Sequence, residues 1–223
     1  SRKPDRSTVI PFRIDPREYR LTPEAEKKLE ELPKEFPGEP PALFIGRLVP
    51  YKGVTVLLDA LARTAGRLVV LGGGPEETRL RAQAAQLGIA ERVTWLPGTG
   101  GDEKLAWLHF CRLLILPSVH PTENFGLVQL EAFACRKPVV STRLESGVRA
   151  VNRDGETGFM VPVGDPGAMA LAMNRLWQEP GLAEKLGENG HRLFLAEYQR
   201  QVFASRHLDW YRRVLETTLE RDI

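Results

Sequence analysis

Short apolar runs alternate with amphipathic stretches along the middle of the chain. Six such runs recur, at residues 42–45, 68–71, 93–96, 113–116, 139–141 and 159–161. Segments with helical periodicity separate them, at residues 54–63, 76–87, 102–110 and in a stretch that reaches residue 134. Short, fully apolar strands that alternate with helices are typical of a parallel sheet covered on both faces. With right-handed crossovers, the pattern predicts an α/β doubly wound, Rossmann-like domain.

The two ends of the chain depart from this alternation. Near the start, a charged stretch from Thr22 to Glu35 reads as a helix, with the Thr22 hydroxyl as its cap and Pro23 in its first turn. Beyond Asp165 the periodicity is wholly helical and predicts a C-terminal helical tail. We therefore divide the chain into a lead-in at 1–40, the doubly wound domain at 41–200 and a terminal helix at 201–223.

Composition narrows the class of protein. Of 223 residues, 42% are hydrophobic and 27% charged, which is ordinary for a globular domain. The net charge of +2 is too small to produce a strong positive electrostatic field that would attract nucleic acid. Cys111 and Cys135 lie far apart among apolar residues, which favours buried free thiols in a reducing cytoplasm.

The loop after the first predicted strand, Gly46–Gly53, carries two cations. Arg47 and Lys52 lie beside the start of the next helix, where the helix dipole disfavours positive charge. An anionic ligand, most simply a phosphate, would relieve this arrangement. Two surface cations without a ligand are an equally good interpretation of this loop alone.

A second glycine-rich loop follows the next strand. Gly72 and Gly74 fit the first part of a dinucleotide fingerprint, but the third position is Glu77 instead of glycine. A close strand-to-helix turn and a ligand loop therefore both remain open. A later cluster at 152–159 is explained as a turn by its Asp-Gly pair.

The loop after the fourth strand is the most informative. We expect a helix to begin near Phe125–Gly126, with free backbone N–H groups that would bind an anion. Glu123 and Glu131 flank this point and lie roughly 12 Å apart along a helix, about the length of a sugar diphosphate nucleoside. The alternatives are a dipole partner for Glu123 and an exposed helix residue for Glu131. The apolar neighbours of Glu131 make an unpaired carboxylate costly there.

Taken together and in order, these motifs resemble glycosyltransferase family 4, whose members are retaining enzymes of the GT-B architecture. The supporting segments are Gly46-Arg47-Leu48 with Lys52-Gly53, Pro117-Ser118, Glu123-x-Phe125-Gly126, Lys137-Pro138-Val139-Val140 and Asp154-Gly155-x2-Gly158. The resemblance implies that the chain is the C-terminal, donor-binding half of a GT-B fold. Residues 1–40 would then be the hinge from an N-terminal acceptor-binding domain that this sequence lacks, and the terminal helix would cross back to that domain.

The resemblance also implies a role for each site residue. Arg47 and Lys52 would hold the donor diphosphate and stabilise it as it leaves, and Glu123 would contact the transferred sugar. Glu131 would hold the ribose hydroxyls. Further donor contacts would come from Gly46, from the backbone of Leu96 toward the nucleobase, and from the amides of Phe125, Gly126 and Leu127. No cofactor or metal is expected. The family usually carries glycine where this chain has Arg13 and Arg136.

The leading hypothesis is a hexosyltransferase of polysaccharide biosynthesis, in which the present sequence alone is inactive. It would move a sugar from a nucleoside diphosphate sugar, with a GDP-mannose-like donor preferred, to a glycan or lipid-linked acceptor. The enzyme would be cytoplasmic and associated with the membrane through that acceptor. The alternatives are a non-catalytic nucleotide-sugar-binding module or split subunit, and a nicotinamide-dependent oxidoreductase, against which the broken glycine fingerprint counts.

Overall fold

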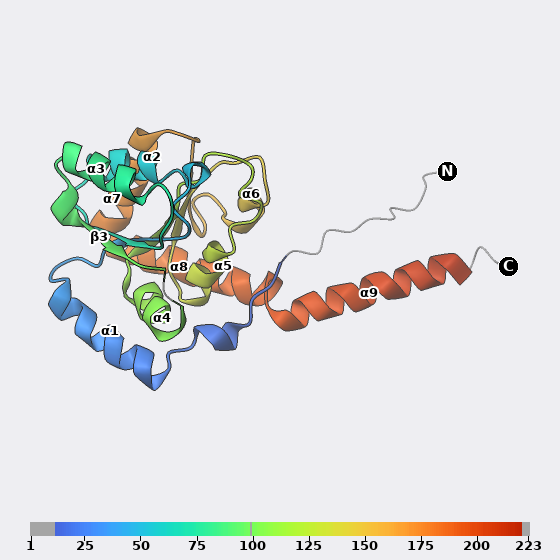
Figure 1. Ribbon diagram of the computed structural model, residues 1–223. Coiled ribbons are helices and arrows are strands. Elements are labelled where there is room, and N and C mark those ends of the chain that lie inside the picture. The colour runs from blue at the N-terminus through green and yellow to red at the C-terminus, as the bar shows by residue number, and fades with distance from the viewer. Residues whose placement is uncertain (1–11, 99, 220–223) are drawn as a thin grey trace.

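The computed structural model describes residues 12–98 and 100–219, with side chains through residue 215. Its centre is a parallel sheet of six strands in the order β3-β2-β1-β4-β5-β6 (Figure 1). The strands are β1 Ala42–Ile45, β2 Leu68–Leu71, β3 Val93–Leu96, β4 Leu113–Leu116, β5 Val139–Thr142 and β6 Gly158–Val161. Each predicted apolar run forms one strand, so the doubly wound fold predicted from the sequence is confirmed.

Helices connect the strands and close the chain. They are η1 Pro16–Tyr19, α1 Pro23–Glu35, η2 Pro50–Lys52, α2 Val54–Leu61, α3 Glu77–Gln86, η3 Ala90–Arg92, α4 Gly101–Phe110, α5 Val128–Ala134, α6 Val148–Val151, α7 Pro166–Gln178, α8 Pro180–Glu197 and α9 Arg200–Leu219. The Thr22 hydroxyl caps α1 by accepting from the Ala25 N–H at 3.1 Å, as predicted. The Asp165 carboxylate caps α7 in the same way, accepting from Ala168 N–H at 2.9 Å.

The sheet separates two apolar cores, because successive strand residues point to opposite faces. In β1, Phe44 belongs to the core under α2, α3 and α7, whereas Leu43 belongs to the core under α1, α4 and α5. Both side chains are fully buried. Figure 1 shows α2 and α3 above the sheet and α1 and α4 below it. α1 contributes Ala25 and Leu32 to the lower core. This helix, which precedes β1 in the sequence, is therefore part of the folded domain.

The C-terminal helix α9 extends away from the domain (Figure 1). At its start, the Arg13 guanidinium lies 5.1 Å from the centre of the Phe203 ring. Farther along, Leu208, Tyr211 and Leu215 are each more than half exposed. In the part of the chain that the structure describes, no helix is long and apolar enough to cross a bilayer.

Both cysteines are buried free thiols, as predicted. Burial raises the pKa of Cys111 to about 11 and shifts the pKa of Cys135 in the same direction. A thiol with a raised pKa carries little thiolate near neutral pH, so neither cysteine has the character of a nucleophile.

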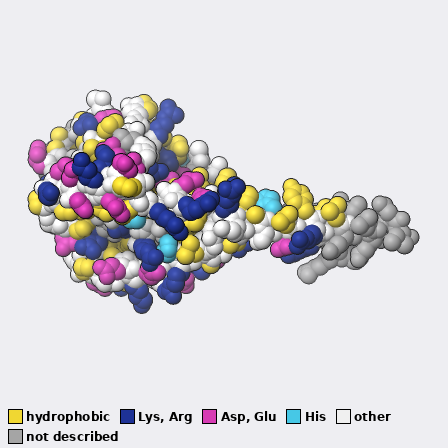
Figure 2. All heavy atoms as spheres, turned by 90° about the horizontal axis from the view of Figure 1, so that it is seen from below, with side chains coloured by type: hydrophobic (Ala, Val, Ile, Leu, Met, Phe, Trp, Pro, Cys, Tyr) yellow, Lys and Arg dark blue, Asp and Glu magenta, His cyan; other side chains and the backbone are white. Residues whose placement is uncertain are grey.

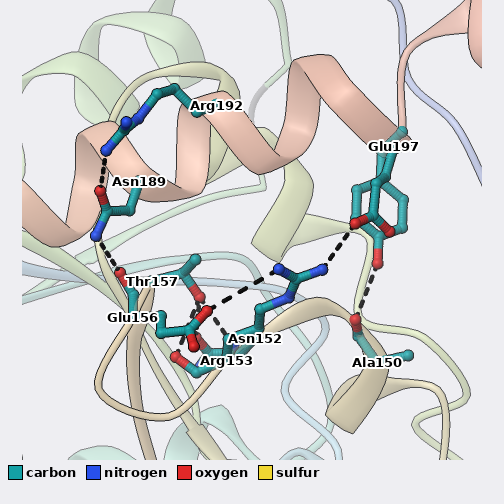
Figure 3. A network of polar contacts seen from close by, with 9 residues as sticks. Ala150, Asn152, Arg153, Glu156, Thr157, Asn189, Arg192 and Glu197 are labelled. Carbon is teal, nitrogen blue, oxygen red and sulfur yellow. Dashed lines mark hydrogen bonds and ion pairs between the residues drawn. The ribbon is translucent and has the colours of Figure 1, made fainter.

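The cluster at 152–159 is a structural brace as well as a turn (Figure 3). The fully buried Asn152 amide donates to the carbonyls of Val139 and Phe159, at 3.2 and 3.1 Å, and so ties β5 to β6. Thr157 donates to Asn152 Oδ1 at 2.9 Å. Arg153 extends the network to Glu197 on α8 with an ion pair of 2.7 Å. These bonds account for the polar residues of this stretch without a ligand.

Candidate functional site

The strand order reverses direction at the pair β1 and β4. The loop after β1 leads to α2 on one face of the sheet, and the loop after β4 leads to α5 on the other. Two loops that diverge in this way leave a crevice at the carboxyl ends of the strands, where doubly wound domains bind their ligands. Arg47 and Lys52 lie on the first loop and Glu123 lies on the second. The fold therefore brings these residues to one edge of the sheet.

The glycine loop after β2 serves as packing for the first loop. A Cβ at Gly72 would lie 1.9 Å from the carbonyl oxygen of Gly46, and one at Gly74 would lie 2.4 Å from that of Leu48. Leu48 N–H also donates to Gly73 O at 2.9 Å. Glycine is thus required for close approach of two backbones, and the interpretation as a tight strand-to-helix turn holds.

Lys52 and Glu123 form a nearly buried ion pair. The Lys52 ammonium lies 2.6 Å from Glu123 Oε2, and the Ser118 hydroxyl donates to the same oxygen at 2.8 Å. Glu123 is only 8% exposed and Ser118 is fully buried. Gly53, with φ +68°, holds this loop against β4, since a Cβ there would lie 2.1 Å from the Pro117 carbonyl oxygen.

Arg47 contrasts with Lys52. Its side chain is exposed and forms no ion pair or hydrogen bond with any residue that the structure describes. The site thus presents one cation that is already compensated by a carboxylate and one that is not. An uncompensated guanidinium at a strand end is suited to binding a diphosphate through paired N–H donors.

The helix after β4 starts later than we predicted, and that part of the sequence interpretation is wrong. α5 begins at Val128, because Gly126 has φ +65°, a left-handed conformation that ends any helix at that point. The Gly126 position is also crowded, since a Cβ would lie 2.5 Å from Leu116 Cδ2. The N–H groups of Gly126, Leu127 and Val128 have no acceptor among the described residues. These groups belong to the segment that follows β4, where a turn precedes the helix.

Glu131 lies one turn inside α5, on the side that faces α4. Its Oε2 atom is buried and lies 2.6 Å from the Lys104 ammonium, while no hydrogen bond of good geometry reaches that oxygen. The Tyr19 hydroxyl also approaches this carboxylate, and burial together with the Glu131 charge raises the pKa of Tyr19. The alternative of an exposed helix residue is therefore wrong. Glu131 does not contact Glu123 and belongs to a separate polar cluster.

The remaining predicted donor contacts lie around this crevice. Phe125 is half-buried, with its ring centre 5.5 Å from that of Phe12, and Leu127 is 43% exposed. Leu96 ends β3, and its carbonyl already accepts a hydrogen bond from Gly72 N–H at 3.0 Å. Gly46 lies against Lys52, whose ammonium is 3.8 Å from the position of a Gly46 Cβ.

Three polar residues of these clusters were not identified from the sequence. Ser118 was seen only as part of a motif, although a hydroxyl just after an apolar strand is itself a signal. Lys104 and Tyr19 carry no such signal, because their proximity to Glu131 depends on how α4 and η1 pack against α5.

The geometry defines a doubly wound domain that places Arg47, Lys52 and Glu123 at its topological switch point. The chain belongs to the glycosyl transferases group 1 family, whose profile matches residues 26–193. It is 38% identical over 163 residues to D-rhamnosyltransferase WbpZ of Pseudomonas aeruginosa, covering 73% of this chain and 41% of that protein. It is 30% identical over 217 residues to O-antigen chain mannosyltransferase C of Escherichia coli, covering 97% of this chain and 56% of that protein. The chain thus spans about half the length of these relatives.

Solved structures share the fold of this chain. Sucrose-phosphate synthase from Thermosynechococcus elongatus matches with a TM-score of 0.80 and 25% identity, over 94% of this chain and 53% of that one. HepE of Anabaena, in complex with UDP and glucose, matches with a TM-score of 0.81 and 23% identity, over 91% and 55%. The C-terminal domain of LpcC, a group 1 glycosyl transferase from Francisella tularensis, matches with a TM-score of 0.70 and 20% identity, over 84% and 99%. The prediction of a Rossmann-like GT-B half with a C-terminal helix is confirmed.

Proposed function

We propose that this chain is the donor-binding half of a retaining glycosyltransferase that uses a nucleoside diphosphate sugar. The observation that supports this most is the arrangement at the switch point of the sheet. There an unpaired Arg47, the Lys52–Glu123 ion pair and three free N–H groups follow the ends of β1 and β4. Cations and free amides at one edge are suited to a diphosphate, and a carboxylate beside them is suited to sugar hydroxyls.

In the proposed mechanism the protein stabilises the charge that develops on the leaving diphosphate. Arg47 and Lys52 compensate that charge, and the amides at Gly126–Val128 donate hydrogen bonds to it. These groups could perform this task without a metal ion. Glu123 then contacts the transferred sugar from the same crevice, close to the bond that breaks. Because Glu123 binds Lys52 in the free protein, arrival of the diphosphate has to redistribute this ion pair.

Glu131 is proposed as the ligand of the ribose hydroxyls. Its carboxylate is held by Lys104, which fixes its orientation on α5 before a nucleotide arrives. Glu131→Ala should weaken binding of the ribonucleotide more than that of its 2′-deoxy analogue, which lacks one of the hydroxyls. Equal losses for the two ligands, measured by calorimetry, would show that Glu131 does not bind the ribose.

The donor sugar is proposed to be of the mannose type. The names of two relatives, a rhamnosyltransferase and a mannosyltransferase, support a GDP-mannose-like donor. HepE was crystallised with UDP and glucose, which makes UDP the competing nucleotide to test. Titration of the chain with GDP, UDP, their sugars and NAD compares these donors directly. Preferential binding of NAD would refute the assignment to a sugar transferase.

Transfer is proposed to need a second, acceptor-binding domain, because the chain covers only 41% and 56% of the length of two relatives. Chemistry requires donor and acceptor to be held together in reacting geometry. We expect the 223-residue chain to bind nucleoside diphosphate and to transfer no sugar to a panel of glycan and lipid-linked acceptors. Turnover by this chain alone would refute that expectation. If the chain binds the donor but transfers no sugar even after an acceptor-binding domain is added, a non-catalytic binding module would be favoured.

A further inference from the structure

One residue outside the candidate donor site has a backbone conformation that its side chain makes costly, and none of the predicted donor-site residues explains it. Arg136 is the only non-glycine residue of the described chain with a positive φ, at +57°. A side chain in this conformation is strained by about 1–2 kcal/mol. The chain therefore keeps an arginine at a position where glycine would relieve strain.

Arg136 lies along a groove on the outer surface of the domain. The groove has a volume of about 550 Å³ and runs between η1, the ends of α4 and α5, α8 and the start of α9. Arg136 lines it at the end of α5. Arg13 lines an adjoining hollow that shares Asp15 and Arg200 with the groove. None of the predicted donor-site residues lines either part.

The groove carries an excess of positive charge. Arg17, Arg20, Arg136 and Arg200 line it, against the single carboxylate of Asp15. Figure 2 shows the dark-blue side chains gathered where the domain meets α9. No lysine lines the groove, so its cations are all planar guanidiniums, which bind phosphate oxygens in pairs.

The local ion pairs leave part of this charge free. Asp15 binds Arg17 at 2.7 Å, and Arg136 pairs with Glu188 from α8. The side chains of Arg20 and Arg200 are exposed and form no hydrogen bond or ion pair with any described residue. Two guanidiniums thus line the groove without an ion-pair partner among the described residues, and the charge of Arg200 acts on Asp15 only at longer range. The net charge of the whole chain is nevertheless only +2.

Two histidines also line the groove. His109 Nε2 lies 3.0 Å from the Tyr19 carbonyl oxygen, and His191 Nδ1 lies 3.1 Å from that of Phe133. Each ring is therefore positioned by the backbone. Burial lowers the pKa of His109, so this ring is neutral near pH 7 and adds no charge to the groove.

We propose that this groove binds a phosphate group, presented either by an anionic lipid headgroup or by a soluble phosphate compound, at a site separate from the donor crevice. Arg20 and Arg200 supply the free charge. Arg136 is held at the rim in its strained conformation and contributes a third guanidinium once its exposed pair with Glu188 is exchanged for phosphate. Exposed ion pairs are weak, so this exchange costs little.

The test uses two probes with the 223-residue chain, in an Arg47→Ala background so that the donor crevice contributes little. Inorganic pyrophosphate is titrated by calorimetry. Vesicles of phosphatidylcholine, with and without phosphatidylglycerol, are tested by co-sedimentation. Binding of pyrophosphate would show that a soluble phosphate compound is sufficient to occupy the groove. Binding only to vesicles that contain phosphatidylglycerol would show that the ligand is the lipid headgroup. Absence of binding to both probes overturns the proposal.

Variants assign the binding to the groove. Arg20→Gln with Arg200→Gln should weaken whichever probe binds about tenfold or more. The control removes two other exposed arginines, Arg81 and Arg175, from α3 and α7 on the other side of the sheet, where each pairs with a glutamate close by in the chain. Equal losses in the two pairs of variants would mean non-specific attraction and would overturn the proposal.

Arg136→Gly separates binding from folding. Glycine is the preferred residue at φ +57°, so the melting temperature should be unchanged or higher. Affinity for the probe should nevertheless fall about fivefold to tenfold, as expected for loss of one charged hydrogen-bonding partner at an exposed site. An affinity equal to that of the parent chain would exclude Arg136 from the site.

Discussion

The Lys52–Glu123 ion pair gives the most decisive test of the candidate site in the absence of ligand. The perturbation is Lys52→Met, which keeps much of the side-chain volume and removes the ammonium. Glu123 is 8% exposed, and its Oε2 atom receives both Lys52 and Ser118. After the substitution, the Ser118 hydroxyl is the only one of these two partners left to a nearly buried carboxylate.

The expected loss of stability follows from burial. Breaking a fully buried ion pair by removing one partner costs about 3–5 kcal/mol. The Lys52 and Glu123 side chains keep 14% and 10% of their exposure, so water can approach and reduce this cost. We expect Lys52→Met to lower the free energy of unfolding by about 2–3 kcal/mol. Glu123→Gln should cost less, about 1 kcal/mol, because glutamine can still accept the Ser118 hydrogen bond.

The measurement is urea unfolding followed by circular dichroism, for the parent, both single variants and the double variant. The double variant should be more stable than the sum of the single losses implies, by about 1–2 kcal/mol, because the second change removes the unpaired charge left by the first. An exposed pair, Arg149 with Glu145, provides the control, and Arg149→Met should cost less than about 0.5 kcal/mol. Additive losses, or equal losses for Lys52 and Arg149, would refute the argument.

Three further predictions concern binding and the turn before α5. Arg47→Ala should leave stability unchanged and weaken nucleoside diphosphate binding by about 1.5–3 kcal/mol, with little effect on the nucleoside alone; calorimetry with both ligands checks this. Lys104→Met should reduce the preference for a ribonucleotide over its 2′-deoxy analogue, because Glu131 loses its fixed orientation; Arg47→Ala should leave that ratio unchanged. Gly126→Ala should lower the free energy of unfolding by more than Gly155→Ala in urea titrations, since both glycines have positive φ but only Gly126 is crowded.

The strands and helices could be predicted because their signals are local. A fully apolar run such as Leu113–Leu116 is buried on both faces of a parallel sheet, and a threonine before a proline caps a helix wherever it lies. The start of α5 could not be predicted in the same way. Gly126 takes a left-handed conformation in a turn where Leu116 leaves no room for a larger residue, and sequence periodicity does not report backbone conformation.

The candidate site divides along the same line. In a parallel sheet the loops after the strands lie at one edge, so the proximity of Arg47, Lys52 and Glu123 could be predicted from the sequence. The contact of Lys104 with Glu131 depends on how α4 packs beside α5, which no spacing in the sequence reports. The basic groove was missed for a related reason, because its free cations come from positions far apart in a chain of nearly balanced charge.

The two cations of the donor crevice differ, and this difference has a consequence for the order of events. Arg47 is unpaired, so a diphosphate can bind it without displacing any described residue. Lys52 is already paired with Glu123, so a phosphate group can pair with the Lys52 ammonium only by drawing that ammonium away from the Glu123 carboxylate. On the proposed function, the diphosphate therefore meets Arg47 first and then releases Glu123 from Lys52. The carboxylate becomes free to contact the sugar only when the donor is in place, so this nearly buried charge keeps its Lys52 partner for as long as the site is empty.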